Sequence, residues 1–387
     1  MCKTPTRSRA HSEVATSSAP RAASGAARRT DGAAARGGAW RRVKQVLLRG
    51  SRSIGLQART LDSRWRQERL LVLCYHGISM LDEHEWNPEL YMPPSMFRRR
   101  LEILRDGGYT VLPLDEAVER LYAGTLPPRS VSLTFDDGAA NFYSEALPLL
   151  SEFGFPATVY LTTYHTQHPD PVFDVTLPYL LWRGRDATLP GEVVGEAGEW
   201  HLRDEKERGD ARLAIHTHLT ECGRDSATEQ AMLADVAARL GVDFDELRAE
   251  RIMHLMSPEE VADAAQRGIS IQLHTHHHRT PRDKSEFARE IEINRQQIEQ
   301  LTGRRSERWH FCYPNGWHAP QFIPWLRELD VRSATTCQPG IASRASEPIL
   351  LPRLVDTALL SETEFEGWLS GIAAFLPRRI QPHIHDY

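Results

Sequence analysis

Two clusters of polar residues have the side-chain types needed to bind a metal ion and to move protons. Asp136 and Asp137 are adjacent, and neighbouring carboxylates repel each other unless a cation or a proton lies between them. Residues 274–278 read His-Thr-His-His-His, which places four imidazoles within five positions. His274 and His278 could turn two ring nitrogens towards one point on a helical turn, and imidazole combined with carboxylate suits zinc.

Each cluster also has a purely structural interpretation. Asp-Asp-Gly is a common turn sequence, and a histidine cluster can lie on a surface without a ligand. Within the cluster, we expect His276 and His277 to face outwards or to support the ligands. A third segment, Pro314-Asn315-Gly316, predicts a tight and exposed turn that could aim a backbone N–H at an oxyanion, although alone it is an ordinary turn.

The elements that carry these clusters alternate between strands and helices. Apolar runs predict strands at 69–78, 109–114, 130–135, 156–163, 269–275, 309–314, 333–337 and 349–354. Helical periodicity and end signals predict helices at 95–106, 115–124, 141–154, 257–268, 283–302 and 320–329, with Ser257 as N-cap and Glu260 three residues on. This order predicts a parallel sheet covered by helices, with the functional groups at the carboxyl ends of the strands.

Composition divides the chain into three parts. Residues 1–60 are predicted to be a disordered basic N-terminal segment, in which 40–60 could form a short helix because Trp40, Val43, Val46 and Leu47 recur at helical spacing. The folded body is predicted to comprise residues 69–164 and 256–387. Residues 165–255 interrupt it as a mostly helical insertion, with an amphipathic helix at 227–240 and no clear strand.

Charge and apolar runs limit the partners. Residues 1–40 carry seven Lys/Arg and two acidic residues, so the remaining chain is acidic, and this argues against a nucleic-acid partner. No apolar run is long enough to span a membrane, whereas peripheral contact of the basic segment with an anionic membrane stays open. Five scattered cysteines and the lack of an apolar leader favour the cytoplasm. The oligomeric state cannot be inferred.

The clusters together resemble the motifs of one known family. "LTFDDG" at 133–138, "HTHHH" at 274–278 and "FCYPNG" at 311–316 are similar, in this order, to the three motifs of the polysaccharide deacetylase family. This family has the NodB homology domain and forms carbohydrate esterase family 4, and the third motif is closest to its exopolysaccharide-deacetylase branch. "YHGI" at 75–78 and "LPRL" at 351–354 also match. The resemblance implies an α/β fold, a distorted (β/α) barrel of about seven parallel strands.

The resemblance also implies a mechanism. Asp137, His274 and His278 would bind a divalent metal, with Zn²⁺ expected, and Asp136 would be the general base. The backbone N–H of Asn315 would help to hold the oxyanion. The expected reaction removes N-acetyl groups from an N-acetylated polysaccharide or glycolipid, which is hydrolysis of a carbon–nitrogen bond other than a peptide bond. Further residues expected to contact the substrate are His76, Tyr313 and Arg353.

Two departures from the family pattern keep other functions open. Cys312 stands where many members have an arginine that supports the catalytic aspartate, and Pro352 stands where the family has a late histidine that protonates the leaving amine. Histidines that could replace that acid are His76, His165, His216, His218 and His318. One alternative is a carbohydrate-binding pseudoenzyme. Another is an O-acetyl esterase, because an alkoxide leaves with less acid assistance than an amine.

The insertion would begin on the catalytic face of the barrel, because it follows the carboxyl end of a strand. It is therefore expected to be a lid, a wall of the substrate groove or an oligomer contact. Its aromatic residues could stack on sugar rings or could form its own small core. These aromatic residues are Tyr164, Phe173, Tyr179 and Trp182.

Overall fold

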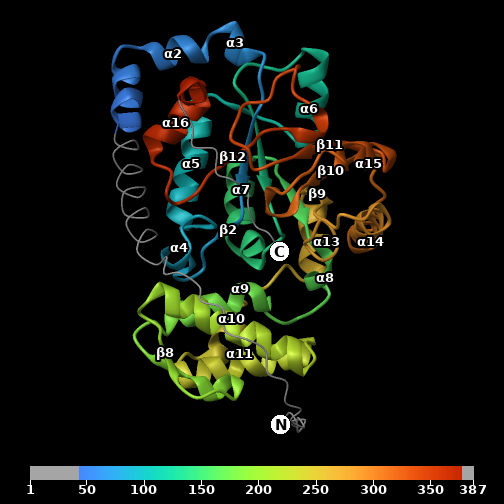
Figure 1. The fold of residues 1–387 in the computed structure, drawn as a ribbon. Coiled ribbons are helices and arrows are strands. Elements are labelled where there is room, and N and C mark those ends of the chain that lie inside the picture. Colours follow the sequence, from blue (N-terminus) through green and yellow to red (C-terminus); the bar gives the residue numbers. More distant parts are fainter. Residues whose placement is uncertain (1–42, 377–387) are drawn as a thin grey trace, which may run out of the picture.

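The computed structural model describes residues 43–376 and centres on seven parallel strands that curl into a barrel (Figure 1). The strands are β1 (Leu71–Tyr75), β5 (Ser130–Phe135), β6 (Thr158–Leu161), β9 (Ser270–Leu273), β10 (Trp309–Cys312), β11 (Val331–Thr335) and β12 (Leu354–Val355). They pair in the order β11-β10-β9-β6-β5-β1-β12, so β1 to β11 of this path follow chain order and the last strand, β12, pairs with the first, β1. This arrangement confirms the predicted distorted (β/α) barrel.

Residues 351–355 contact both edges of the sheet. On one side, the Leu351 N–H donates to the Ala334 carbonyl at 2.8 Å, and the Thr336 N–H donates to the Leu351 carbonyl at 3.0 Å. On the other side, Leu354 pairs in parallel register with Leu73 of β1. The barrel is thus closed by the segment that was predicted to contain the last strand.

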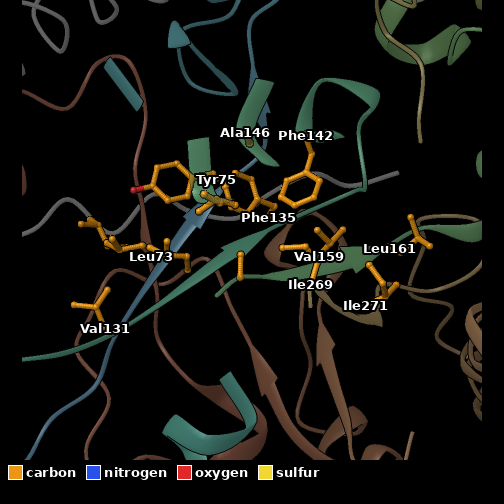
Figure 2. Packing of buried hydrophobic residues seen from close by; sticks show 14 of the residues in the cluster. Leu73, Tyr75, Val131, Phe135, Phe142, Ala146, Val159, Leu161, Ile269 and Ile271 are labelled. Carbon is orange, nitrogen blue, oxygen red and sulfur yellow. The ribbon is translucent and has the colours of Figure 1, made fainter. Parts of the chain in front are cut away.

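The strands place alternate residues on the outer and inner faces of the barrel, because the side-chain period of a strand is two. The outer positions are large and apolar and pack under the helices, as Figure 2 shows for Tyr75, Phe135, Phe142 and their neighbours. Tyr75 stacks on Phe135 with ring centroids 5.2 Å apart. The inner positions include buried polar residues, among them Ser132, Thr134, Gln272, His310 and Ser333. Polar side chains therefore line part of the barrel interior beneath the site.

The helices agree with their sequence signals. Around the barrel lie α5 (Pro94–Asp106), α6 (Leu114–Ala123), α7 (Leu147–Phe153), α13 (Pro258–Gln266), α14 (Lys284–Thr302), α15 (Phe322–Glu328) and α16 (Glu362–Ser370). Ser257 and Glu260 form the predicted capping box of α13. Shorter elements are α2 (Leu56–Leu61), α3 (Arg64–Gln67), α4 (Glu83–Trp86), β2 (Gly77–Ile78), β3 (Tyr91–Met92) and β4 (Thr110–Val111), and β4 pairs with β5 outside the barrel order. No helix of residues 43–376 is both long and apolar enough to cross a membrane.

The prediction of disorder through residue 60 is wrong for residues 43–60. Residues 43–53 are helical and α2 follows, whereas residues 1–42 lie outside the described part. The predicted apolar face is also wrong, because Val46 and Leu47 are 67% and 48% exposed. Leu48 is instead fully buried in the main core, and Lys44 forms an ion pair with Glu364 of α16 at 3.5 Å. Because the segment is rich in basic residues, its sequence did not indicate that one leucine, Leu48, is buried and packs this helix against the main core.

The segment between β6 and α13 has its own hydrophobic core, and Figure 1 shows its helices stacked beyond one end of the barrel. Its elements are α8 (Thr163–Thr166), α9 (Phe173–Arg183), β7 (Thr188–Pro190), β8 (Glu199–His201), α10 (Glu205–Cys222), α11 (Ser226–Leu240) and α12 (Phe244–Ala249). The amphipathic helix at 227–240 is present as α11. The expectation of no strand is wrong, because β7 and β8 form an antiparallel pair too short to show alternation. The boundaries 165 and 255 stay a prediction.

Candidate active site

Three loops at the carboxyl ends of β5, β9 and β10 carry the site. Each loop contains a residue other than glycine in left-handed conformation: Asp137 (φ 71°), His278 (φ 56°) and Asn315 (φ 55°). Asp, His and Asn adopt this conformation more readily than most residues, yet it remains uncommon. Such backbone conformations cluster at functional sites, where the surrounding structure holds them in place.

Glycines allow two of these loops to pack closely. Gly138 has φ 84°, and a Cβ atom there would lie 2.3 Å from a methyl carbon of Leu161. Gly316 has φ 68°, and a Cβ atom there would lie 2.8 Å from the Cβ of Cys337. Any larger residue at either position would push the loop away from the barrel and displace the functional residues beside it.

Asp137, His274 and His278 converge on one point. Asp137 Oδ1 lies 3.1 Å from His274 Nε2 and 3.2 Å from His278 Nε2. The ligand atoms of all three residues lie within 4.8 Å of one another. The other nitrogen of His274, Nδ1, lies 2.8 Å from the Cys312 carbonyl, so an N–H there donates to it and leaves the Nε2 lone pair free. Two imidazoles and one carboxylate arranged in this way fit a zinc-type site.

The backbone path to this point differs from the sequence expectation. Residues 274–278 are not helical, so the prediction of a helical turn is wrong. Thr275 (φ 63°) and His278 (φ 56°) instead fold the loop back on itself. His276 Nδ1 lies 2.9 Å from Thr163 Oγ1, and His277 Nδ1 lies 2.9 Å from Glu290 Oε1. His276 and His277 thus face other partners, as predicted.

The two aspartates have different basic partners. Asp136 is 2% exposed and its carboxylate accepts two hydrogen bonds of 2.7 Å from the Arg353 guanidinium, one on each oxygen. Burial alone would raise the pKa of Asp136, but the Arg353 charge lowers it below the usual range. Burial likewise opposes ionisation of Asp137, and its contacts with the His274 and His278 rings lower its pKa. Both carboxylates therefore stay ionised at neutral pH.

Two buried thiols complete the surroundings of Asp136. The Sγ atoms of Cys312 and Cys74 lie 3.3 Å and 3.5 Å from Asp136 Oδ2. Burial raises the pKa of both thiols well above the ordinary value, so they are neutral and can act as weak donors. Cys312 leaves room for the guanidinium of Arg353, whose Nη2 lies 3.0 Å from its sulfur.

The expected substrate contacts of Tyr313 and Arg353 are wrong. Both side chains are fully buried, and the Tyr313 hydroxyl donates to the Ile349 carbonyl at 3.2 Å. His76 lies beside the site, with Nε2 3.9 Å from Asp136 Oδ2 and its side chain 20% exposed. Asn315 is exposed and lines the cavity described below. A role for His76 with the substrate and one for the Asn315 N–H with an oxyanion both stay predictions.

A cavity of about 1190 Å³ opens over the metal-type cluster. Asp137, His278, Asn315 and Trp317 line it on the barrel side. The insertion supplies the facing wall through residues of α9, α10, the connection from α10 to α11 and the segment before α13, including Val175, Arg212, Leu213, His216, Arg224 and Arg251. Phe173 and Tyr179 are 2% and 0% exposed in the core of the insertion, so neither can stack on a sugar ring.

His254 was missed by the sequence reasoning. It lines the cavity although it is only 6% exposed. Its Nδ1 lies 2.9 Å from the Ile252 carbonyl, which leaves Nε2 as its remaining polar atom. Its own carbonyl accepts from Ala140 N–H at 2.8 Å, so it is fastened to the loop after β5. A histidine near the end of a long insertion has no motif spacing by which to be recognised.

A seven-stranded (β/α) barrel with two histidines and a carboxylate converging above its strand ends has the donor set of a hydrolytic metal site. The sequence model of the polysaccharide deacetylase family matches residues 123–334, which is more than half of the chain. The chain belongs to this family, and the resemblance found in the motifs is confirmed.

Similar proteins extend this assignment. YxkH of Bacillus subtilis, named as a member of the same family, is 33% identical over 94 residues, which are 24% of this chain and 32% of YxkH. The poly-beta-1,6-N-acetyl-D-glucosamine N-deacetylase of Escherichia coli is 30% identical over 97 residues, which are 25% of this chain and 14% of that enzyme. The chain thus matches a third or less of the length of these relatives.

A solved structure with the same fold is the Streptococcus pyogenes deacetylase PplD in complex with acetate. It is 19% identical with a TM-score of 0.51, and the alignment covers 80% of this chain and 99% of PplD. IcaB from Ammonifex degensii is 16% identical with a TM-score of 0.50, over 78% of this chain and 97% of IcaB. At these identities the two structures support the fold.

Proposed function

We propose that this protein is a metal-dependent hydrolase that removes N-acetyl groups from an N-acetylated saccharide, either a polysaccharide or a glycolipid. The observation that carries the proposal is the convergence of Asp137, His274 and His278 beside a second, separately held carboxylate, Asp136. A purely binding protein has no use for Asp136 in this state. Relatives named as deacetylases, including one that acts on poly-N-acetylglucosamine, support the substrate class.

Asp137, His274 and His278 would hold the metal, with Zn²⁺ suited to this donor set. A divalent metal bound there would act as a Lewis acid on the acetyl carbonyl oxygen. Residues of the chain would then stabilise the oxyanion and transfer the proton. Asn315 is held with φ 55° at the cavity wall, where its backbone N–H can donate to the oxyanion that forms when water attacks.

Asp136 would accept the proton of the attacking water. Arg353 orients both of its oxygens, and the Cys312 and Cys74 thiols approach Oδ2, so Oδ1 keeps a further lone pair for the water. The low pKa makes Asp136 a modest base and, once protonated, a strong acid. The same carboxyl group can therefore pass the proton to the departing nitrogen, so that the carbon–nitrogen bond breaks to give acetate and a free amine.

This use of one carboxyl group would account for the missing late histidine. The cavity histidines His165, His216 and His254 all have a lowered pKa, and burial is the first cause for each. They are neutral at pH 7 and are poorly suited to give a proton to an amine. O-acetyl ester hydrolysis remains the second candidate, because an ester does not need that proton and Pro352 stands where the family has its acid.

The test is acetate release from paired N-acetylated and O-acetylated oligosaccharides by the purified protein. We expect release from the N-acetylated member of each pair, with a free amine appearing in equal amount. Release confined to the O-acetylated members would replace the proposal by the esterase. Tight saccharide binding without release from either would indicate the pseudoenzyme.

A further inference from the structure

The cavity over the site is rich in arginine. Five arginines line it, against the carboxylates Asp137, Asp174 and Glu286. The arginines are Arg212, Arg224, Arg251, Arg279 and Arg282. This enrichment contrasts with the chain as a whole, whose net charge is −5. Because Asp137 belongs to the proposed metal cluster, the charge facing a bound saccharide is positive.

Three of the five guanidinium groups are neutralised by carboxylates. Arg224 pairs with Asp174 at 2.8 Å and with Glu229 at 2.5 Å. Arg279 pairs with Glu290 at 2.9 Å, and Arg251 pairs with Glu260. These pairs fix the walls of the cavity and add little net charge to it.

Arg212 and Arg282 differ from the other three. Both are exposed, and no ion pair within residues 43–376 involves either of them, Glu286 included. Arg212 comes from α10 in the insertion, and Arg282 follows His278 by four residues on the barrel side. Each wall of the cavity thus contributes one unpaired guanidinium.

Arg282 also lies against an aromatic surface. Its guanidinium carbon is 5.5 Å from the ring centroid of Trp317, which lines the cavity as well. Stacking on an indole holds the planar guanidinium in place while its edge N–H groups stay free. An aromatic ring beside a fixed cation suits a sugar that carries negative charge.

A neutral saccharide would leave both guanidinium groups without a partner of opposite charge. The planar guanidinium donates paired N–H bonds to carboxylate and phosphate oxygens, and these charge-assisted bonds are stronger than those to a neutral hydroxyl. Unpaired charge of one sign in a cleft also concentrates ligands of the opposite sign.

We propose that the acetylated saccharide bound at this site carries an anionic group, a carboxylate or a phosphate, which Arg212 and Arg282 recognise. This inference rests on the proposed deacetylase function and names the substrate class for it. The carboxylate would come from a uronic acid within a glycan, and the phosphate from a sugar phosphate or its lipid-linked form.

The experiment compares three probes that all contain N-acetylglucosamine. They are a neutral chitotetraose, a tetrasaccharide with alternating glucuronic acid, and N-acetylglucosamine 1-phosphate. We expect KM for at least one anionic probe to be about tenfold below that for chitotetraose at low salt, with the advantage falling as NaCl is added. A preference for the uronic-acid probe identifies a glycan carboxylate, and one for the 1-phosphate identifies a phosphate.

Variants assign the preference to the two side chains. Arg212→Gln with Arg282→Gln should remove the anionic advantage, so that the KM values for the anionic probes become equal to that for chitotetraose. Arg289→Gln is the matched control, because Arg289 is exposed on α14 and does not line the cavity. Equal KM values for neutral and anionic probes, or an anionic advantage that survives the double substitution, would overturn the inference.

Equilibrium binding of the same probes to chelator-treated protein gives an independent measurement. Turnover is absent there, and an anion cannot bind directly to a metal, so the anionic advantage must persist through the arginines alone. Absence of acetate release from every probe by the metal-loaded protein would count against the deacetylase function. Charge-independent binding would count against this inference instead.

Discussion

Asp136 and Asp137 are neighbours in sequence, yet the fold gives them different partners. Asp136 continues the inner face of β5 and meets Arg353 inside the barrel, whereas the left-handed backbone of Asp137 turns its side chain towards His274 and His278. In the proposed mechanism, one carboxylate is thereby left for the metal and the other for the proton. Adjacent acidic residues are compatible here because each has its own cation or donor.

Arg353 is the residue whose removal best tests this division. In Arg353→Met the carboxylate of Asp136 would stay buried without its counter-charge, and we expect a loss of about 3–5 kcal/mol in the free energy of unfolding. Arg353→Lys should lose less, because one charge remains while the paired hydrogen bonds are lost. Denaturant unfolding measures both effects.

The same variants should change the pH dependence of turnover. Arg353→Lys keeps the charge but loses the paired hydrogen bonds that also lower the pKa of Asp136, so the acid limb of kcat/KM should move to higher pH in this variant. A purely structural arginine would lower stability and leave the position of that limb unchanged. The pH profile of kcat/KM therefore separates the two roles.

At this scale the sequence predicted the metal cluster and missed the support of Asp136. "LTFDDG" and "HTHHH" indicate Asp137, His274 and His278 through their resemblance to the motifs of the family. Arg353 and Asp136 are 217 positions apart in the sequence. In this chain Arg353 contacts the aspartate, whereas many family members have the supporting arginine at the position of Cys312. The sequence alone does not indicate this change in the position of the arginine, because the contact forms only when the barrel is folded.

At the scale of elements, α8 carries a partly buried histidine, His165, which lines the cavity. Burial is the first cause that lowers the pKa of His165 to about 4. Between pH 6.5 and 4 the unfolded chain binds this proton and the folded chain does not, so stability should fall as pH is lowered through that window. We expect His165→Gln to show a shallower loss of stability over this range in urea unfolding, whereas identical slopes would show that His165 is not the cause.

Substitutions in the insertion wall should change the binding of substrate and leave the binding of metal unchanged. Leu213 of α10 lines the cavity and is 66% exposed, whereas Phe173 and Tyr179 are buried in the core of the insertion. We expect Leu213→Ser to raise KM for an oligosaccharide with little change in metal content or stability. A small acetylated substrate that does not reach the wall is the control, and an equal rise in KM for it would contradict a wall at this position.

Replacing residues 170–250 with a Gly/Ser linker should have the same effect in stronger form. Metal binding should survive, because all three ligands lie on barrel loops. An unchanged KM for the oligosaccharide would contradict the prediction that residues 165–255 form a lid or a wall of the substrate groove. The free energy of unfolding of this variant must also be measured, because Trp86 and Tyr91 of the barrel pack against the core of the insertion and would lose these contacts.

At the scale of the whole molecule, the alternation of strands and helices predicted the barrel because each strand is a short apolar run with a clear end. The strands β1, β5, β6, β9, β10 and β11 lie in the sheet in chain order, whereas the predicted strand at 109–114 appears as β4 outside this order. The closing segment 351–355 and the antiparallel pair of β7 and β8 are short and irregular, so their positions depend on tertiary contacts. Localisation in the cytoplasm and the oligomeric state stay untested.

The N-terminal helix gives the prediction at this scale. A protein beginning at Leu61 would lose Leu48, which is fully buried, and the ion pair of Lys44 with Glu364. We expect its free energy of unfolding to fall by at least about 1.5–3 kcal/mol, the contribution of one buried leucine. A protein beginning at residue 43 is the control and should be nearly as stable as the full chain. Equal stability of the two shortened proteins would show that this helix contributes nothing.

The most direct test of the central claim measures bound metal and acetate release together. Wild-type protein should hold about one equivalent of zinc or a similar ion, lose acetate release with a chelator and regain it on addition of metal. Asp137→Asn should lose both metal and activity, while Asp136→Asn should keep the metal and lose several orders of magnitude in turnover. Undiminished acetate release by metal-free wild-type protein, or by both aspartate variants, would contradict the account.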